Sequence, residues 1–278
     1  MMGQRMMWGI TGRERRYMFG VTVLAAVVVS VTSVGILPAA PGADRPVHIH
    51  MIGASSEYNA KDTLMLLNKR LTELYDVKVT MTRGPGEARE LDGLEQLESA
   101  DLLVLYTRRL KLNDEDWSRI QAYLESDRPI VAIRTASHAF DKNFPDFDEK
   151  ILGASYQGHR GDKPVQVSVV EKHRTHPILQ GISSWKRAWG DLYDNVNFAD
   201  STTVLLNGDD GRRTMPVAWT NQIGDRRVFY TSMGIPEDFR KDEQFMRLLV
   251  NGIKWSLEGA LSSVDSSGDE AARPEDQG

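Results

Sequence analysis

The chain has 278 residues and a formal net charge of −5, with 34 lysine and arginine residues against 39 aspartate and glutamate residues. This acidic balance argues against nucleic acid as a partner, because nucleic-acid-binding domains carry a basic face. The chain contains no cysteine, which excludes disulfides, thiolate metal sites and thiol catalysis.

Residues 1–43 have the pattern of a secretory signal peptide. Four arginines lie among the first 16 residues, residues 18–40 are uncharged and mostly apolar, and small residues follow. The apolar run also approaches the length that spans a bilayer, so the alternative is an uncleaved N-terminal anchor. We therefore expect an exported protein, in the periplasm or outside the cell, with residues 18–40 as a membrane tether if the signal is not cleaved.

The first half of the body alternates strands with helices. The expected helices are Asp62–Tyr75 and a second one that Asn113 caps. The expected strands are Val47–Ile52, Val77–Thr82, Ser99–Thr107 and Pro129–Ile133. This alternation predicts an α/β fold with a flavodoxin-like parallel sheet, helices on both faces and Ile130–Ile133 in a central position.

The sequence of the second half of the body predicts strands that are not separated by regular helices. Two apolar strands flank residues 221–225, whose Gly224 indicates the turn of an antiparallel hairpin near the C-terminus. Asp242–Glu258 has the apolar stripe of a closing helix. The expected strands are Val165–Val170, Thr202–Leu206, Pro216–Thr220 and Arg226–Ser232. Residues 44–261 thus suit one domain, and residues 262–278, acidic and without apolar periodicity, form a predicted disordered tail.

The turn after the central strand has the pattern of a nucleophile elbow. Such a sharp strand-to-helix turn needs small residues two places either side of its central residue, and Ala132 and Ala136 occupy those places. The central residue is Arg134, which can bind or polarise a ligand but cannot attack one. Its permanent charge should pair with a carboxylate, for which Asp191 and Glu57 are the candidates, or meet an anionic or strongly polar group of a ligand.

Other polar residues follow predicted strands or lie in loops. Glu57 comes after the first strand, His138 after Arg134, His159 in the glycine-rich segment GASYQGHRG, and Asp191 and Tyr193 in GDLYD. Chemistry in open α/β sheets gathers at the carboxyl ends of strands, so we expect Arg134, His138, His159 and Asp191 to share one pocket there. Purely structural alternatives are an acid at a helix N-terminus for Glu57 and a helix cap for His138.

Three further interpretations depend on less specific patterns. His138 and His159 with Glu57 or Asp191 suit a divalent metal, but no spacing such as HExxH supports a site. A serine hydrolase pair of Ser137 and His138 is disfavoured, because adjacent residues should not readily bond as nucleophile and base. Trp185 and Trp189 suit either sugar stacking or packing, and His173 and His176 suit structural hydrogen bonds.

Six segments in order resemble the ThuA-like (trehalose utilisation) family: IVAIRTASHAF, LGASYQGHRG, HPILQGI, DLYDN, PVAWT and RRVFYTSMG. The resemblance covers about residues 47–259 and implies a class I glutamine amidotransferase-like fold without the cysteine nucleophile, hence not a glutamine amidotransferase. It also implies a role in the metabolism of disaccharides, including keto sugars. Two positions depart from the family: Arg134 replaces a histidine found in many members, and Ile235 replaces the histidine that usually follows FYTSMG.

The resemblance leaves two hypotheses of different classes. The first is an exported enzyme (a hydrolase, lyase or isomerase) that acts on a sugar or oxidised sugar, with an unidentified cofactor that a divalent metal would suit. The second is a non-catalytic carbohydrate-binding or accessory domain. The predicted catalytic residues are His159, His138, Arg134 and Asp191, and the predicted substrate-binding residues are Glu57, Ser137, Tyr156 and Tyr193.

Overall fold

The computed structural model of the protein describes residues 45–161 and 164–264. The predicted signal or anchor and residues 265–278 of the predicted tail lie outside this part of the chain. Residues 262–264 do make contacts: Asp76 N–H donates to the carbonyl of Ser262, and Val264 N–H donates to that of Leu74. No helix within the described part combines the length and the apolar character needed to cross a membrane.

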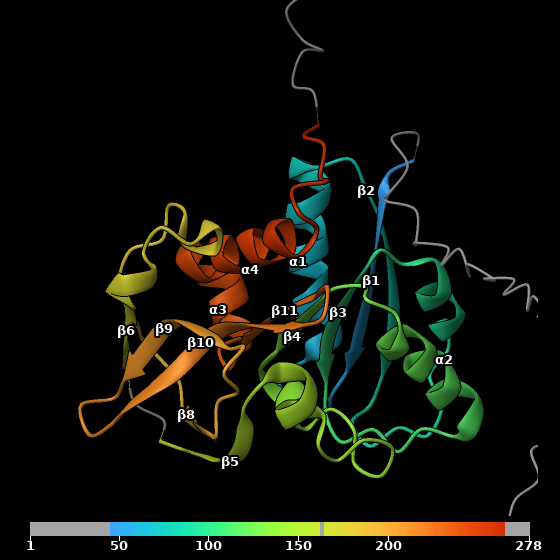
Figure 1. The fold of residues 1–278 in the computed structure, drawn as a ribbon, viewed down its shortest axis with the longest axis horizontal. Helices are drawn as coiled ribbons and strands as arrows, with labels where there is room; N and C mark the ends of the chain where they lie inside the picture. The colour runs from blue at the N-terminus through green and yellow to red at the C-terminus, as the bar shows by residue number, and fades with distance from the viewer. Residues whose placement is uncertain (1–44, 162–163, 265–278) are drawn as a thin grey trace, which may run out of the picture. The chain divides into compact units, whose positions relative to one another are not determined.

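A nine-stranded mixed sheet forms the centre of the fold, and its first five strands are parallel (Figure 1). Their spatial order is β2-β1-β3-β4-β11, the flavodoxin-like order. The bounds are β1 Val47–Ala54, β2 Val77–Gly84, β3 Leu102–Thr107, β4 Ile130–Ile133 and β11 Arg226–Thr231. The predicted parallel sheet is confirmed, with β4 between β3 and β11.

Four antiparallel strands continue the sheet beyond β11. They are β10 Thr214–Ile223, β9 Thr203–Asp209, β6 Val165–Val169 and β7 Trp185–Arg187. Gly224 in the turn between β10 and β11 has a φ of 57°, a conformation that glycine adopts without strain, and the predicted hairpin is confirmed. The antiparallel part contains β7, which the sequence analysis did not predict. This strand is only three residues long and carries little apolar pattern, so its sequence contains no clear strand signal.

A separate two-stranded sheet pairs β5, Ser155–Arg160, with β8, Leu192–Val196. The sequence analysis predicted neither strand. Most residues of β5 are partly or fully exposed, so the strand shows no apolar alternation. These two strands carry several of the predicted site residues.

Helices cover both faces of the parallel sheet, as predicted. On one face α1 (Ala60–Leu74), α3 (Pro236–Lys241) and α4 (Glu243–Ser256) pack in one apolar cluster, with Leu64 and Leu248 fully buried. On the other face α2 (Asp114–Glu125) packs with η1 (Leu94–Ser99) (Figure 1). The remaining short helices are η2 Arg134–His138, η3 Asp148–Leu152, η4 Glu171–His173 and η5 Pro177–Leu179. Burial on both faces explains the nearly continuous apolar sequence of the central strands.

The predicted N-cap of α2 is also confirmed. The side chain of Asn113 accepts a hydrogen bond of 2.9 Å from the backbone N–H of Asp116. Asp114, Glu115 and Asp116 lie in the first turn, where negative charge interacts favourably with the helix dipole. The cap fixes the start of the helix that leads into β4.

We predict that Gly252→Ala destabilises the protein. In a helix interior this change normally stabilises by up to about 1 kcal/mol. Here a Cβ on Gly252 would overlap the ring of Phe229, so α4 would have to move away from β11, at a cost of about 1–3 kcal/mol. The free energy of unfolding from chemical denaturation measures this effect. Phe229→Leu, added as a second change, should recover part of the loss, and a stabilised Gly252→Ala single variant would contradict this packing.

Candidate functional site

The turn that follows β4 is strained at its central residue. Arg134 has a φ of 50°, in the left-handed region that residues other than glycine rarely adopt. Holding a side chain there costs on the order of 1 kcal/mol or more, so the surrounding contacts must impose this conformation. The nucleophile-elbow geometry predicted from Ala132 and Ala136 is therefore present, with an arginine at its tip.

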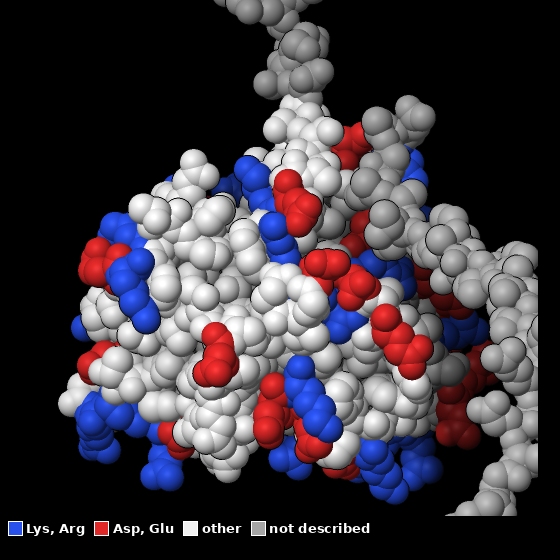
Figure 2. All heavy atoms as spheres, in the orientation of Figure 1, with Lys and Arg blue, Asp and Glu red and all other residues white. Residues whose placement is uncertain are grey.

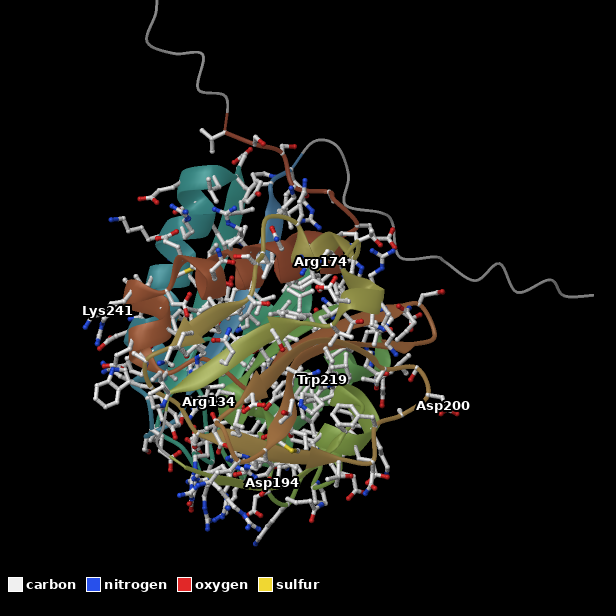
Figure 3. All side chains as sticks on the ribbon, turned by 90° about the vertical axis from the view of Figure 1, so that its left-hand side faces the viewer. Arg134, Arg174, Asp194, Asp200, Trp219 and Lys241 are labelled. Atoms are coloured by element: carbon white, nitrogen blue, oxygen red, sulfur yellow. The ribbon has the colours of Figure 1, made fainter. Side chains whose placement is uncertain are left out.

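The Arg134 side chain turns into the protein and not toward solvent. It is 1% exposed, and its Nη2 donates to Oδ1 of Asp191 at 2.6 Å while Nη1 donates to the Ser232 carbonyl at 3.1 Å. The guanidinium carbon also lies 4.1 Å from the ring centroid of Tyr58. Figure 3 shows Arg134 in the same lower part of the molecule as Asp194 of β8. Arg134 thus reaches a ligand only through Asp191.

The predicted pairing of Arg134 with a carboxylate is correct for Asp191 and wrong for Glu57. Glu57 lies in the loop after β1 and pairs with Arg108 at 3.2 Å. The reason is local, since Arg108 follows the neighbouring strand β3 and its guanidinium is partly exposed, whereas Arg134 is enclosed. Glu57 therefore pairs with the partly exposed arginine after β3 and not with the enclosed Arg134.

A chain of polar contacts leads from Asp191 to the surface. Nε2 of His159 lies 3.8 Å from Oδ2 of Asp191, and its Nδ1 lies 2.8 Å from the Tyr156 hydroxyl. The Asp191 side chain is 11% exposed and that of His159 is 53% exposed. His159 is therefore the most exposed member of this chain of contacts.

His159 is not the loop residue that the sequence analysis expected. It lies in β5 opposite Tyr193 of β8, and the pairing register shifts between Tyr156 and His159. Gly158 sits inside this irregularity with a φ of 127°. The glycine pattern that suggested a loop instead marks a β-bulge, a feature that re-aims side chains.

Aromatic rings hold the histidines in place. The His138 ring stacks on that of Tyr156 with a centroid distance of 4.7 Å, and Tyr156 lies 4.8 Å from Tyr193. Tyr193 is 1% exposed and lies 5.6 Å from the His159 ring. The rings of Tyr156 and Tyr193 thus connect η2 to β5 and β8.

One interpretation from the sequence, that Ser137 and His138 should not bond, is wrong. The Ser137 hydroxyl lies 3.0 Å from Nδ1 of His138, because the tight turn of η2 folds the two side chains together. Ser137 is only 4% exposed, so its hydroxyl lies beneath the imidazole. Its contact orients His138.

A depression of about 720 Å³ opens at this cluster and is here called the His138 pocket. Its volume falls within the range of about 300–1,000 Å³ typical of small-molecule sites. The lining residues are Arg109, His138, Phe140, Asp141, Pro145, Tyr156, Gln157, Gly158 and His159. Asp191, Arg134 and Tyr193 stand behind this lining, while Glu57 and Ser137 are not part of it.

Burial and neighbouring charge set the protonation of two lining groups. Burial, followed by the positive charges of Arg109 and Arg108, lowers the pKa of His138 from 6.5 to about 3, so its ring is neutral at pH 7. Burial, and next the charge of Asp191, raises the pKa of Tyr156 to about 12. The phenol therefore keeps its proton, and its hydroxyl can donate to Nδ1 of His159 or accept from it, according to the tautomer of the ring.

The predicted metal ligands do not form a metal site in the described part of the chain. No group of three histidine, aspartate or glutamate side chains there could hold a metal ion. Nδ1 of His138 faces Ser137, Asp191 binds Arg134, and Glu57 binds Arg108. Ser137, Arg134 and Arg108 would therefore compete with a divalent cation for these donor groups.

The remaining residues singled out in the sequence lie elsewhere. Ile235 precedes α3 and lines a separate depression with Trp185 and Trp189. Trp185 donates its indole N–H to Asp242 at 2.6 Å, and His176 accepts from the N–H of Ile178 at 3.2 Å. Both contacts match the structural alternatives.

Two residues of the site escaped the sequence analysis. Tyr58 covers the guanidinium of Arg134, and Arg109 lines the His138 pocket. Arg109 lies two residues after the predicted strand Ser99–Thr107, so its place at the carboxyl end of a parallel strand was a usable signal. Tyr58 lies in the loop between β1 and α1 and gave no comparable signal.

Comparison with known families finds one match. The model of the ThuA family, described as trehalose utilisation, matches residues 51–256. This range includes every residue of the His138 pocket and the groups behind it. A comparison with curated proteins finds no match.

Solved structures share the fold at low sequence identity. A putative ThuA-like protein from Parabacteroides merdae has a TM-score of 0.63 at 18% identity, covering 78% of this chain and 92% of its own. One from Bacteroides uniformis has a TM-score of 0.58 at 16% identity, covering 77% and 93%. Agd3, a carbohydrate deacetylase, has a TM-score of 0.52 at 15% identity, covering 79% of this chain and 33% of its own.

Two substitutions of Arg134 should distinguish the cost of its backbone strain from the loss of its ion pair with Asp191. Arg134→Ala and Arg134→Gly both leave Asp191 without its partner, which should destabilise the protein by about 3 kcal/mol. Only glycine also relieves the positive φ, so Arg134→Gly should be about 1 kcal/mol more stable than Arg134→Ala. Urea denaturation of both variants measures the difference. Equal stabilities would show that the turn is not strained.

The stability of the protein should fall at acid pH partly through His138. Its pKa in the folded state is about 3, so below pH 6.5 the unfolded chain binds a proton that the folded chain does not bind. This difference favours unfolding progressively as the pH falls from 6.5 toward 3. Between pH 7 and 5 the midpoint of thermal unfolding should therefore fall more in the unaltered protein than in His138→Gln. The same fall in both would contradict a buried neutral imidazole.

Proposed function

The chain belongs to the ThuA (trehalose utilisation) family, and from this we propose that it binds a sugar or an oxidised (keto) sugar in the His138 pocket, in disaccharide catabolism. The proposed reaction is proton transfer on that sugar, with His159 as the acid or base. The observation that carries the proposal is the contact of the exposed His159 with both Tyr156 and the enclosed Asp191.

The lining of the pocket suits the surface of a sugar ring. A pyranose presents apolar C–H faces and a rim of hydroxyl groups, and so requires aromatic surface next to hydrogen-bonding groups. Tyr156 and Phe140 supply aromatic rings, while Arg109, Gln157 and His159 supply polar atoms. The volume of about 720 Å³ is sufficient for a disaccharide.

His159 has the contacts of a positioned acid–base group. A general acid or base needs an accessible nitrogen and partners that fix its tautomer. Tyr156 at Nδ1 and Asp191 near Nε2 supply those partners, and half of the side chain is exposed. In the tautomer whose Nδ1–H donates to the Tyr156 hydroxyl, Nε2 of His159 is free to take a proton from the sugar. Asp191 would stabilise the imidazolium that forms, and Arg134 is a positioning residue that holds Asp191.

One observation favours the alternative, a non-catalytic carbohydrate-binding domain. The two positions at which this chain departs from its family place no reactive group in the pocket: Arg134 is enclosed, and Ile235 lines a different depression. In this alternative the same pocket binds the sugar and releases it unchanged. The two functions therefore differ in turnover and not in the place of binding.

The test is a panel of disaccharides and their keto forms, with binding measured by calorimetry and turnover by proton NMR. Tyr156→Phe removes one hydrogen-bonding group and should weaken binding about tenfold. His159→Gln should lower turnover by about 10²–10⁴-fold while it changes affinity much less. His173→Gln, a partly exposed histidine in η4, is the matched control and should change neither quantity.

The outcomes separate the two functions. Binding that depends on Tyr156, with no turnover of any sugar in the panel, supports the binding domain and contradicts the enzyme. Turnover that survives His159→Gln contradicts the assigned acid–base role. If no sugar binds, both functions are wrong.

We also propose that the protein is exported and that residues 1–43 are removed, with a membrane tether through residues 18–40 as the alternative. The basic start, apolar run and small residues of the sequence support this proposal. N-terminal sequencing of protein from its native host should give a start near residue 44. An intact N-terminus in the membrane fraction would identify a tether, and an intact N-terminus in soluble cytoplasmic protein would contradict export.

A further inference from the structure

We propose that the sugar bound in the His138 pocket carries a carboxylate, as uronic and aldonic acids do, and that Arg109 binds this group. This inference rests on the proposed function and adds the substrate class. It depends on the placement of Arg109, on its unpaired charge and on the state of the groups around it.

Backbone hydrogen bonds fix Arg109 at the rim of the pocket. Its N–H donates to the carbonyl of His138 at 2.8 Å, and the N–H of Leu110 donates to that of Ala139 at 2.7 Å. Arg109 has a φ of 50°, a strained conformation that a glycine would adopt freely. The guanidinium therefore starts from a rigid backbone beside the His138 ring, at the carboxyl end of β3.

The charge of Arg109 has no carboxylate partner within 4 Å among the described residues. Both cationic neighbours are paired: Arg108 with Glu57 at 3.2 Å, and Lys111 with Glu87 at 3.0 Å. Asp141, the acid in the pocket lining, also faces Lys111, at 3.5 Å. The exposed Arg109 is thus the member of this basic run whose charge is free to meet a ligand.

The other charges near the pocket are already neutralised. Asp191 is paired with Arg134, Tyr156 keeps its proton, and His138 is neutral at pH 7. Figure 2 shows lysine and arginine side chains gathered along the lower edge of the molecule, the edge at which β5 lies in Figure 1. Arg109 is therefore the lining cation without an ion pair among the described residues, whereas the lining acid Asp141 shares Lys111 with Glu87.

One planar guanidinium suits a carboxylate better than a phosphate. The paired N–H groups of arginine match the two oxygens of a carboxylate, and a single positive charge balances a single negative one. A phosphate monoester carries up to two charges and three acceptor oxygens, and would require further donors. The pocket supplies Arg109 as its unpaired cation, so the geometry favours a monoanion.

The experiment compares three ligands of one disaccharide: the neutral sugar, its acid with one carboxylate, and its phosphate ester. At low salt the acid should bind the unaltered protein at least tenfold more tightly than the neutral sugar, as measured by calorimetry. Arg109→Gln should abolish this preference, because it should weaken binding of the acid at least tenfold more than binding of the neutral sugar. Arg109→Gly should also lose the preference for the acid. Because glycine adopts this positive φ without strain, the variant controls for misfolding of Arg109→Gln.

Arg160→Gln is the matched control. Arg160 is an exposed arginine of β5 that pairs with Asp194 at 3.2 Å and is not part of the pocket lining, so its removal should preserve the preference for the acid. If the neutral sugar binds as tightly as the acid, or if Arg109→Gln weakens both equally, the inference is wrong and the proposed function stands. Tighter binding of the phosphate ester would also overturn the carboxylate assignment. If no sugar binds at all, the proposed function itself has failed.

Discussion

The ion pair between Arg134 and Asp191 is the interaction on which the site depends. It joins the tip of a strained turn after β4 to the residue that precedes β8, so it fixes the small β5–β8 sheet against the end of the large sheet. Because Arg134 is almost fully buried, its charge requires this carboxylate. Asp191 in turn faces His159, and Arg134 thereby sets the surroundings of the histidine without contacting a ligand.

The site places two histidines in opposite environments, one buried and one exposed. His138 is packed under Tyr156 and beside two arginines, which keeps its imidazole neutral. His159 projects from a bulged strand and keeps half of its surface exposed, between a phenol and a carboxylate. One histidine therefore contributes shape and a neutral hydrogen-bonding edge, and the other contributes an accessible nitrogen. This division is what makes proton transfer at the pocket a reasonable function.

A strained backbone at two adjoining strand ends supports this arrangement. Arg109 after β3 and Arg134 after β4 both have a φ of 50°, and the first is hydrogen-bonded to the turn that the second begins. Arg134 points inward to an acid, whereas Arg109 points to the pocket without one. Such strain persists only where neighbouring contacts impose it, and it is concentrated at functional sites. The carboxyl ends of β3 and β4 thus supply both the buried support of the site and its exposed charge.

The sequence alone determined the parallel sheet, the hairpin at Gly224, the cap at Asn113 and the elbow at Arg134, because these depend on local patterns of apolar, turn and capping residues. Tertiary structure decided which acid Arg134 pairs with, that Ser137 contacts His138, and that His159 lies on a strand. Sequence spacing contains no information on which of two acids faces an enclosed arginine or on how a polar, half-exposed strand such as β5 finds its partner. Those choices follow from contacts between segments far apart in the chain, where packing overrides local pattern.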